Sequence, residues 1–148
     1  MNDQNITEGQ CLCGAVKFSI KGTNLGLYQC HCSECRKITG SNANSSVIVP
    51  ETLFSWVEGE EKITSYTHSS GYRSDFCSSC GSPAPNKIKN KPLFWVPAGA
   101  LSQSALLEVK AHICISSKAA WETSDLTGTQ YNEVPSFEKL LEVIGTYN

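Results

Sequence analysis

Seven of the eight cysteines fall into three short groups, and this spacing constrains the fold more than any other feature of the chain. The groups are Cys11 and Cys13 in a Cys-x-Cys, then Cys30, Cys32 and Cys35 in a Cys-x-Cys-x-x-Cys, and last Cys77 and Cys80 in a Cys-x-x-Cys. Thiols this close together in sequence are typical of metal ligation or redox chemistry. The fold must therefore hold short turns that carry two or three thiols each.

The first and last groups together predict a filled metal site. Thiolate-bound zinc is tetrahedral with Zn–S bonds of about 2.3 Å, so its sulfurs lie about 3.8 Å apart. A Cys-x-x-Cys turn reaches that spacing, and Gly81 beside it can adopt a positive φ. A Cys-x-Cys on a strand places both side chains on one face. We therefore expect a structural zinc site made of Cys11, Cys13, Cys77 and Cys80.

The middle group, within QCHCSECRKITGS, supplies three thiols of its own. Catalytic zinc sites keep three protein ligands and an open fourth position, whereas structural sites are filled. We therefore expect Cys30, Cys32 and Cys35 to form an open, catalytic zinc site.

Disulfide bonds are the alternative explanation for so many cysteines. The first residues, MNDQNITEGQ, lack the basic and apolar regions of a secretory signal. A cytoplasmic location is therefore expected, where thiols stay reduced and metal ligation is favoured over disulfides.

Three residues beside the ligands have open roles. His31 lies between two expected ligands and points away from them if the segment is extended. It could be a fourth ligand, a proton shuttle, or a solvated or structural residue. The solvated or structural role is favoured. Arg36 and Lys37 are either surface charges or cations that lower a thiolate pKa and attract an anionic substrate.

Three residues near the C-terminus are expected to be structural. His112 and Cys114 alternate on a predicted strand and should pack in the core or at a sheet edge. Trp121 is expected to pack in the core rather than to line a pocket.

The composition is that of an ordinary globular chain, with 40 % apolar and 18 % charged residues, and we expect a single domain over 1–148. The net charge of −2 does not indicate binding to nucleic acid or an anionic membrane surface. No stretch reaches the roughly 20 apolar residues needed to span a bilayer. The oligomeric state is left open.

Alternating apolar residues predict a mainly β fold, as at Val16, Phe18 and Ile20. Further strands are expected at Leu25–Gln29, Ser46–Val49, Leu53–Val57, Lys62–Thr67, Tyr72–Phe76, Leu93–Val96 and Ala111–Ile115. Two short helices are expected, over Ser33–Ile38 and after Pro135, the second capped by Ser136 and ended by Gly145.

The segments CLCGAVKFSI, CHCSECRKITGS, FCSSCGSP and AHICISSKAAW…QYNEVP together resemble the glutathione-dependent formaldehyde-activating enzyme family, also called the centromere-protein-V domain family. The resemblance implies a zinc-stapled β-sheet domain of the Mss4-like kind. It implies the same two zinc sites that the spacing predicts. At Cys114 and Ala120 the chain differs from residues common in the family.

The activity that this resemblance implies is a carbon–sulfur lyase reaction of the S-(hydroxymethyl)glutathione synthase type. Glutathione or a related thiol would be joined to formaldehyde or another small aldehyde at the three-cysteine zinc site. The alternative is a zinc-stabilised binding module, or a thiol or metal sensor, without catalysis.

Overall fold

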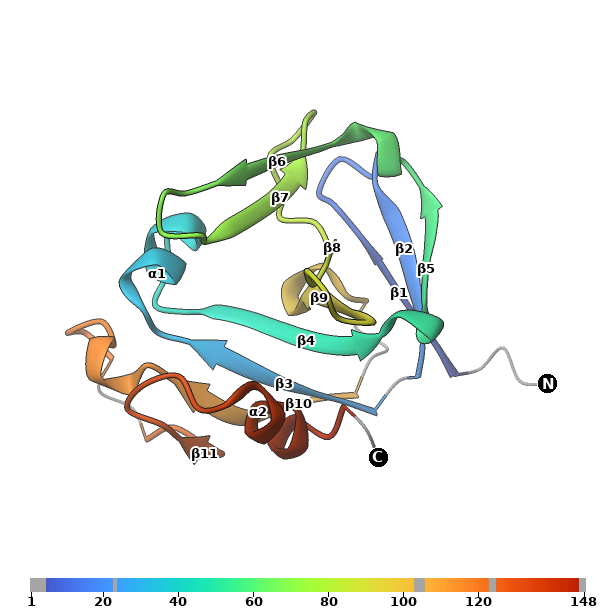
Figure 1. Ribbon diagram of the computed structural model, residues 1–148. Coiled ribbons are helices and arrows are strands. Elements are labelled where there is room, and N and C mark those ends of the chain that lie inside the picture. The colour runs from blue at the N-terminus through green and yellow to red at the C-terminus, as the bar shows by residue number, and fades with distance from the viewer. Residues whose placement is uncertain (1–4, 23, 103–105, 123–124, 147–148) are drawn as a thin grey trace.

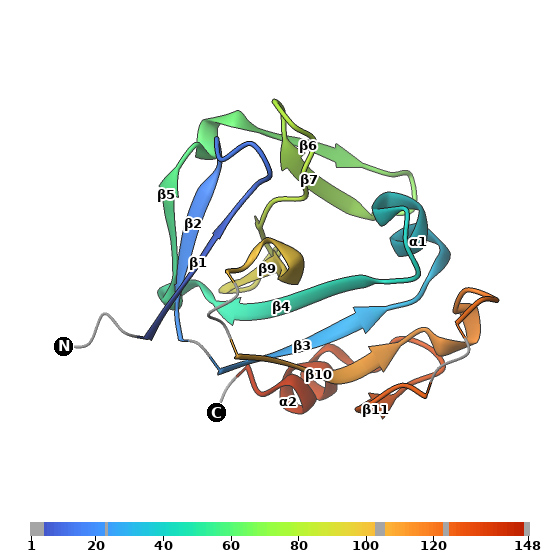
Figure 2. The ribbon, with the colours of Figure 1, turned by 180° about the vertical axis from the view of Figure 1, so that it is seen from behind.

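A computed structural model describes residues 5–22, 24–102, 106–122 and 125–146, which form three β-sheets and two α-helices (Figures 1 and 2). The first sheet has the order β1-β2-β5 and consists of β1 (Ile6–Gln10), β2 (Lys17–Lys21) and β5 (Phe54–Glu58). The third sheet is the hairpin of β6 (Ile63–Thr67) and β7 (Arg73–Cys77). The prediction of a mainly β fold is confirmed.

The second and largest sheet has the order β11-β10-β3-β4-β9-β8. Its strands are β11 (Thr129–Gln130), β10 (Leu106–Ile113), β3 (Asn24–Cys30), β4 (Asn44–Pro50), β9 (Leu93–Pro97) and β8 (Asn86–Lys87). The helices α1 (Ser33–Thr39) and α2 (Phe137–Ile144) begin and end close to the predicted positions. Neither is long and apolar enough to cross a membrane, and no other helix in the described ranges is either.

Two parts of the strand prediction differ from the structure. Strand β1, the first half of β10 and the two-residue strands β8 and β11 were not expected. The residues of β1 and of the first half of β10 alternate only weakly in polarity. The strand expected over Ala111–Ile115 ends at Ile113, because Cys114 turns into the left-handed region with φ 60° and ψ 40°. That turn removes Cys114 from the sheet and changes where its side chain lies.

The largest sheet separates two hydrophobic clusters. Along β4, Val47 and Val49 pack toward the β1-β2-β5 sheet, in a cluster that also holds Phe18 and Phe54. Ile48, which points to the opposite face as strand geometry requires, packs in the cluster that contains α2. Burial of both faces explains the unbroken apolar run in β4.

Helix α2 covers the outer face of the largest sheet, over β3 and β10 (Figures 1 and 2). The Ser136 hydroxyl caps it by accepting a hydrogen bond from the Lys139 amide at 3.1 Å. Leu140, Leu141 and Ile144 are buried against the sheet, which explains why a helix of two turns is stable here.

A glycine in β3 sets how closely α2 approaches. A methyl group built on Gly26 would lie 2.1 Å from the Ile144 carbonyl oxygen, which is backbone and cannot rotate away. We expect Gly26→Ala to lower the free energy of unfolding by about 3 kcal/mol, as overpacking does elsewhere. Gly99→Ala, where an added methyl meets nothing within 4 Å, is the matched control for urea denaturation. Equal stability of the two variants would contradict this account of the contact.

Strand β10 runs parallel to β3, with Ile113 opposite Cys30. This pairing brings the end of β10 beside the middle cysteine group, although the two segments lie far apart in the chain. Two residues separate the end of β3 from the start of α1, and the amide of one of them, His31, donates to the Ile113 carbonyl at 3.0 Å, so the end of β10 lies beside this junction.

Candidate functional site

The first cysteine cluster joins the loop between β1 and β2 to the turn that follows β7. The sulfurs of Cys11, Cys13, Cys77 and Cys80 all lie within 4.8 Å of one another. Cys11 Sγ lies 3.7 Å from Cys13 Sγ, which lies 3.9 Å from Cys77 Sγ. These distances agree with the spacing of about 3.8 Å in tetrahedral zinc thiolate sites, so the donor set fits zinc.

Glycines make the tight turns of this cluster possible. Gly14 has φ 82° and Gly81 has φ 78°, which are conformations that other residues rarely adopt. The turn at Gly14 aims the Val16 amide at Cys11 Sγ, 3.3 Å away. An amide donor of this kind stabilises a thiolate.

A serine links the two halves of the first cluster. Ser82 Oγ lies 3.2 Å from Cys80 Sγ, and it accepts a hydrogen bond from the Leu12 amide at 3.0 Å. Hydrogen bonding to the Ser82 hydroxyl, helped by backbone amides, lowers the pKa of Cys80 to about 5. The Cys80 sulfur is therefore a thiolate at neutral pH, which is the form that ligates metals.

The second cluster lies at the junction of β3 and α1. Cys30 ends the strand, Cys32 caps the helix and Cys35 lies in its first turn. Their three sulfurs lie within 4.8 Å of one another. The Cys35 amide donates to Cys32 Sγ at 3.3 Å, which fixes the side chain of the capping cysteine.

Hydrogen bonds concentrate negative charge on one sulfur of this cluster. The contact with Cys30, with further donation from Tyr72, lowers the pKa of Cys35 to about 6. The same contact, together with burial, raises the pKa of Cys30. Tyr72 Oη lies 3.3 Å from Cys35 Sγ, and burial raises the pKa of that phenol, so it keeps its proton and donates. Asn44 Nδ2 in turn donates to Tyr72 Oη at 3.3 Å.

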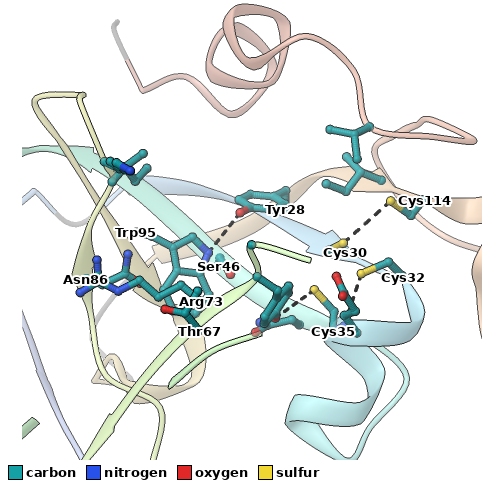
Figure 3. Close-up of a pocket in the computed structure, with 18 of the residues that line it drawn as sticks. Tyr28, Cys30, Cys32, Cys35, Ser46, Thr67, Arg73, Asn86, Trp95 and Cys114 are labelled. Carbon is teal, nitrogen blue, oxygen red and sulfur yellow. Dashed lines mark hydrogen bonds between the residues drawn. The ribbon is translucent and has the colours of Figure 1, made fainter. Parts of the chain in front are cut away.

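A cavity of about 830 Å³ opens beside the second cluster, and all three of its cysteines line it (Figure 3). Tyr28, Tyr72 and Trp95 supply aromatic walls. Trp95 Nε1 donates to Tyr28 Oη at 3.1 Å, which fixes both rings. The cavity can therefore hold a molecule of moderate size next to the sulfurs.

The charged residues of the cavity wall are mostly basic. Arg73, Lys87 and Lys89 line it, together with one carboxylate, Glu34. The Arg73 guanidinium is oriented by two hydrogen bonds to Asp75, at 2.8 and 2.9 Å. The cavity is therefore suited to a ligand that carries negative charge away from its reacting group.

His31 is buried, and it does not join the sulfur group within the described ranges. Its Nε2 lies 2.9 Å from Nδ1 of His112, which is also buried. Burial lowers the pKa of both imidazoles, so the pair is neutral at pH 7. The buried contact with His112 supports a structural role for His31. The expectation of a solvated side chain is wrong. The expected burial of His112 is confirmed.

Three other expectations are settled by position. Arg36 and Lys37 are not among the residues that line the cavity, where Arg73, Lys87 and Lys89 supply the positive charge instead. Trp121 is 68 % exposed, so the expectation that it packs in the core is wrong. Ala119, two residues earlier in the chain, is buried.

Sequence analysis missed the cavity wall. Tyr72, Trp95 and Cys114 come from three distant segments, and only the strand pairing brings them beside the cysteines. An unassigned eighth cysteine was the one signal in the sequence that pointed to Cys114. All eight cysteines are free thiols, so the disulfide alternative finds no support in the structure.

The chain is similar to known proteins in both sequence and fold. A family model described as "Glutathione-dependent formaldehyde-activating enzyme" matches residues 6–117, a span that contains both cysteine clusters and Cys114. A crystal structure of a Rhodobacter sphaeroides protein is similar to this one with a TM-score of 0.51 and 23 % sequence identity, over 65 % of this chain and 88 % of that chain. At that identity the likeness extends to the fold alone.

Proposed function

The chain belongs to the glutathione-dependent formaldehyde-activating enzyme family, and on that premise we propose that it joins a thiol to a small aldehyde. Glutathione and formaldehyde are the proposed pair, and the reaction class is that of a carbon–sulfur lyase. The observation that carries the proposal is the group of three sulfurs, within 4.8 Å of one another, in the wall of a cavity of about 830 Å³.

We propose zinc in both clusters, with a structural role for the four-cysteine site and a catalytic role for the three-cysteine site. Cys30, Cys32 and Cys35 would hold the second zinc ion, which would favour the thiolate form of a bound thiol at neutral pH. Three thiolates would leave such a centre with one negative charge. In this proposal the zinc therefore contributes less to the rate by polarising the aldehyde oxygen than by orienting the two reactants.

The residues of the cavity have separate tasks in this proposal. Lys89 attracts the carboxylates of glutathione, with Lys87 and Arg73, which also pair with Glu51 and Asp75, as weaker contributors. Tyr28 and Trp95 pack against its uncharged backbone. The thiol sulfur forms a bond to the carbonyl carbon, and the proton of the thiol ends on the carbonyl oxygen, so no oxidant or reductant is needed.

Tyr72 is the side chain that we assign to the developing alkoxide. Its hydroxyl lines the cavity beside the sulfurs and keeps its proton at neutral pH, because burial raises the pKa of the phenol. The single proton of that hydroxyl, donated to Cys35 Sγ in the structure, would turn to the aldehyde oxygen as the carbon–sulfur bond forms and would stabilise the negative charge there. A reducing compartment such as the cytoplasm remains the expected setting, because the proposed ligands must stay reduced.

A zinc-stabilised binding module and a thiol or metal sensor are the alternatives. A binding module should be indifferent to glutathione. A sensor should lose the second metal ion on mild oxidation by hydrogen peroxide and should not accelerate any reaction. The cavity beside the sulfurs favours the enzyme, because neither alternative requires one.

The test is a rate measurement on the zinc-loaded protein with glutathione and formaldehyde. We expect the adduct S-hydroxymethylglutathione to form faster than in buffer at the same thiol concentration, as followed by NMR exchange. S-methylglutathione, which has no free thiol, is the control and should not react with formaldehyde. An unchanged rate, with no effect of glutathione on the metal site, would favour the binding module.

A further inference from the structure

Cys114 is the eighth cysteine, and it lies at the second cluster although it is distant in sequence. Its Sγ is 4.0 Å from Sγ of Cys30, and both side chains are buried. Cys114 also lines the cavity together with the other three cysteines, and its sulfur points toward them (Figure 3).

The backbone at Cys114 departs from the strand to place that sulfur. Its φ of 60° is a conformation that costs a residue other than glycine about 1–2 kcal/mol. Hydrogen bonds on either side hold the turn, from the Ile115 amide to the Tyr131 carbonyl at 3.0 Å and from the Ser117 amide to the Cys114 carbonyl at 3.0 Å. A strained residue held by its surroundings at a cavity indicates a functional role.

The distance distinguishes between two roles for the pair of sulfurs. A disulfide would need the sulfurs at about 2.05 Å, so the 4.0 Å separation would have to close by about half. Two sulfurs on one tetrahedral zinc lie about 3.8 Å apart, which the Cys30–Cys114 pair nearly meets. Cys114 Sγ does not lie within 4.8 Å of all three sulfurs of the second cluster, so it has to move toward the others to complete a tetrahedron. The first cluster has the same spacing, with 3.7 and 3.9 Å between its sulfurs.

The charge of the cavity wall also suits a fourth thiolate. Four thiolates and one zinc ion carry a net charge of −2, which is costly to bury without compensation. Arg73, Lys87 and Lys89 line the same cavity, together with the carboxylate of Glu34. Arg73 pairs with Asp75 at 2.8 Å and Lys87 with Glu51 at 3.5 Å, so among the described residues Lys89 is the wall cation without an ion pair.

We propose that Cys114 is a fourth sulfur ligand of the second metal site, and that it closes this site until a substrate thiol replaces it. The inference rests on the metal-binding part of the proposed function. An incoming thiol would gain its place by exchange with Cys114, and its proton would pass to the Cys114 sulfur. The charge at the metal would then stay the same as the substrate binds.

The test uses cobalt(II) as a coloured substitute for zinc, with Cys114→Asn as the main variant. Asparagine tolerates the left-handed backbone and offers no sulfur. Because the variant leaves three sulfur ligands in place of four, the sulfur-to-cobalt absorption of the second site should fall by about a quarter. The zinc affinity of the second site should fall roughly 100-fold, if each of the four ligands contributes an equal share of the binding free energy.

Two further variants keep the result interpretable. Cys114→Ala should give the same spectral change as the asparagine variant. Ile20→Val lies in the other hydrophobic cluster and controls for a general loss of stability, so its spectrum should match the wild type.

Two outcomes would overturn the inference, and they can be told apart. If the wild-type chain takes up two metal ions but the Cys114 variants keep its spectrum and affinity, the role of Cys114 is wrong and the proposed function stands. If the wild-type chain takes up a single metal ion, held by the first cluster, the inference and the proposed catalytic site both fail.

Discussion

Replacing Cys13 with serine is expected to abolish the stable fold, although the side chain of Cys13 is exposed. An exposed substitution usually changes the free energy of unfolding by no more than about 0.5 kcal/mol. A structural zinc site contributes about 10–16 kcal/mol, which is comparable with the whole stability of a domain, about 5–15 kcal/mol. Loss of one of the four ligands should therefore unfold most of the protein.

The measurement combines metal analysis with circular dichroism during thermal unfolding. Leu12→Ser is the matched control, because Leu12 lies between Cys11 and Cys13 and is 86 % exposed. That variant should keep both metal ions and the wild-type melting temperature. If Cys13→Ser melts like the control, the first cluster does not stabilise the fold through a metal.

Replacing Cys32 with serine should have a different result, a folded protein that has lost its activity. Cys32 is only partly buried and belongs to the second cluster, so the first cluster should still hold the fold together. The zinc content should fall from about two equivalents to about one, and the rate of thiol addition should fall by about 100-fold or more, since loss of an outer-shell group alone costs 10–100-fold.

Ser33→Ala is the control for Cys32→Ser, since Ser33 is the adjacent exposed residue on α1. It should retain both zinc equivalents and the wild-type rate. Full activity in a Cys32→Ser protein with one zinc equivalent would exclude catalysis at the second site.

The cysteine spacing was sufficient to predict which sulfurs would come together. Within each group the geometry is set locally. Gly14 and Gly81 take the strained positions in the turns of the first cluster, and the capped start of α1 sets the spacing of Cys32 and Cys35. The alternating strands and the capped helix α2 were predictable for the same reason, because their determinants lie within a few residues.

The cavity beside the second cluster could not be predicted in this way. It depends on the parallel pairing of β10 with β3, and the sequence pattern does not specify which strands pair. The same pairing buries His31 against His112, which sequence reasoning placed on separate elements. Cys114 was expected to continue a strand, and the left-handed turn that brings it to the cavity has no sequence signal of its own.

The two clusters differ in how much of the chain must be present before they can form. Cys30, Cys32 and Cys35 lie within six consecutive positions, whereas Cys13 and Cys77 are 64 positions apart. A ribosome adds roughly 5–20 residues per second, so the compact group leaves it seconds before Cys77 and Cys80 do. During biosynthesis the three-cysteine group would therefore be complete before the four-cysteine group, while Cys114, the proposed fourth sulfur of the second site, would follow both.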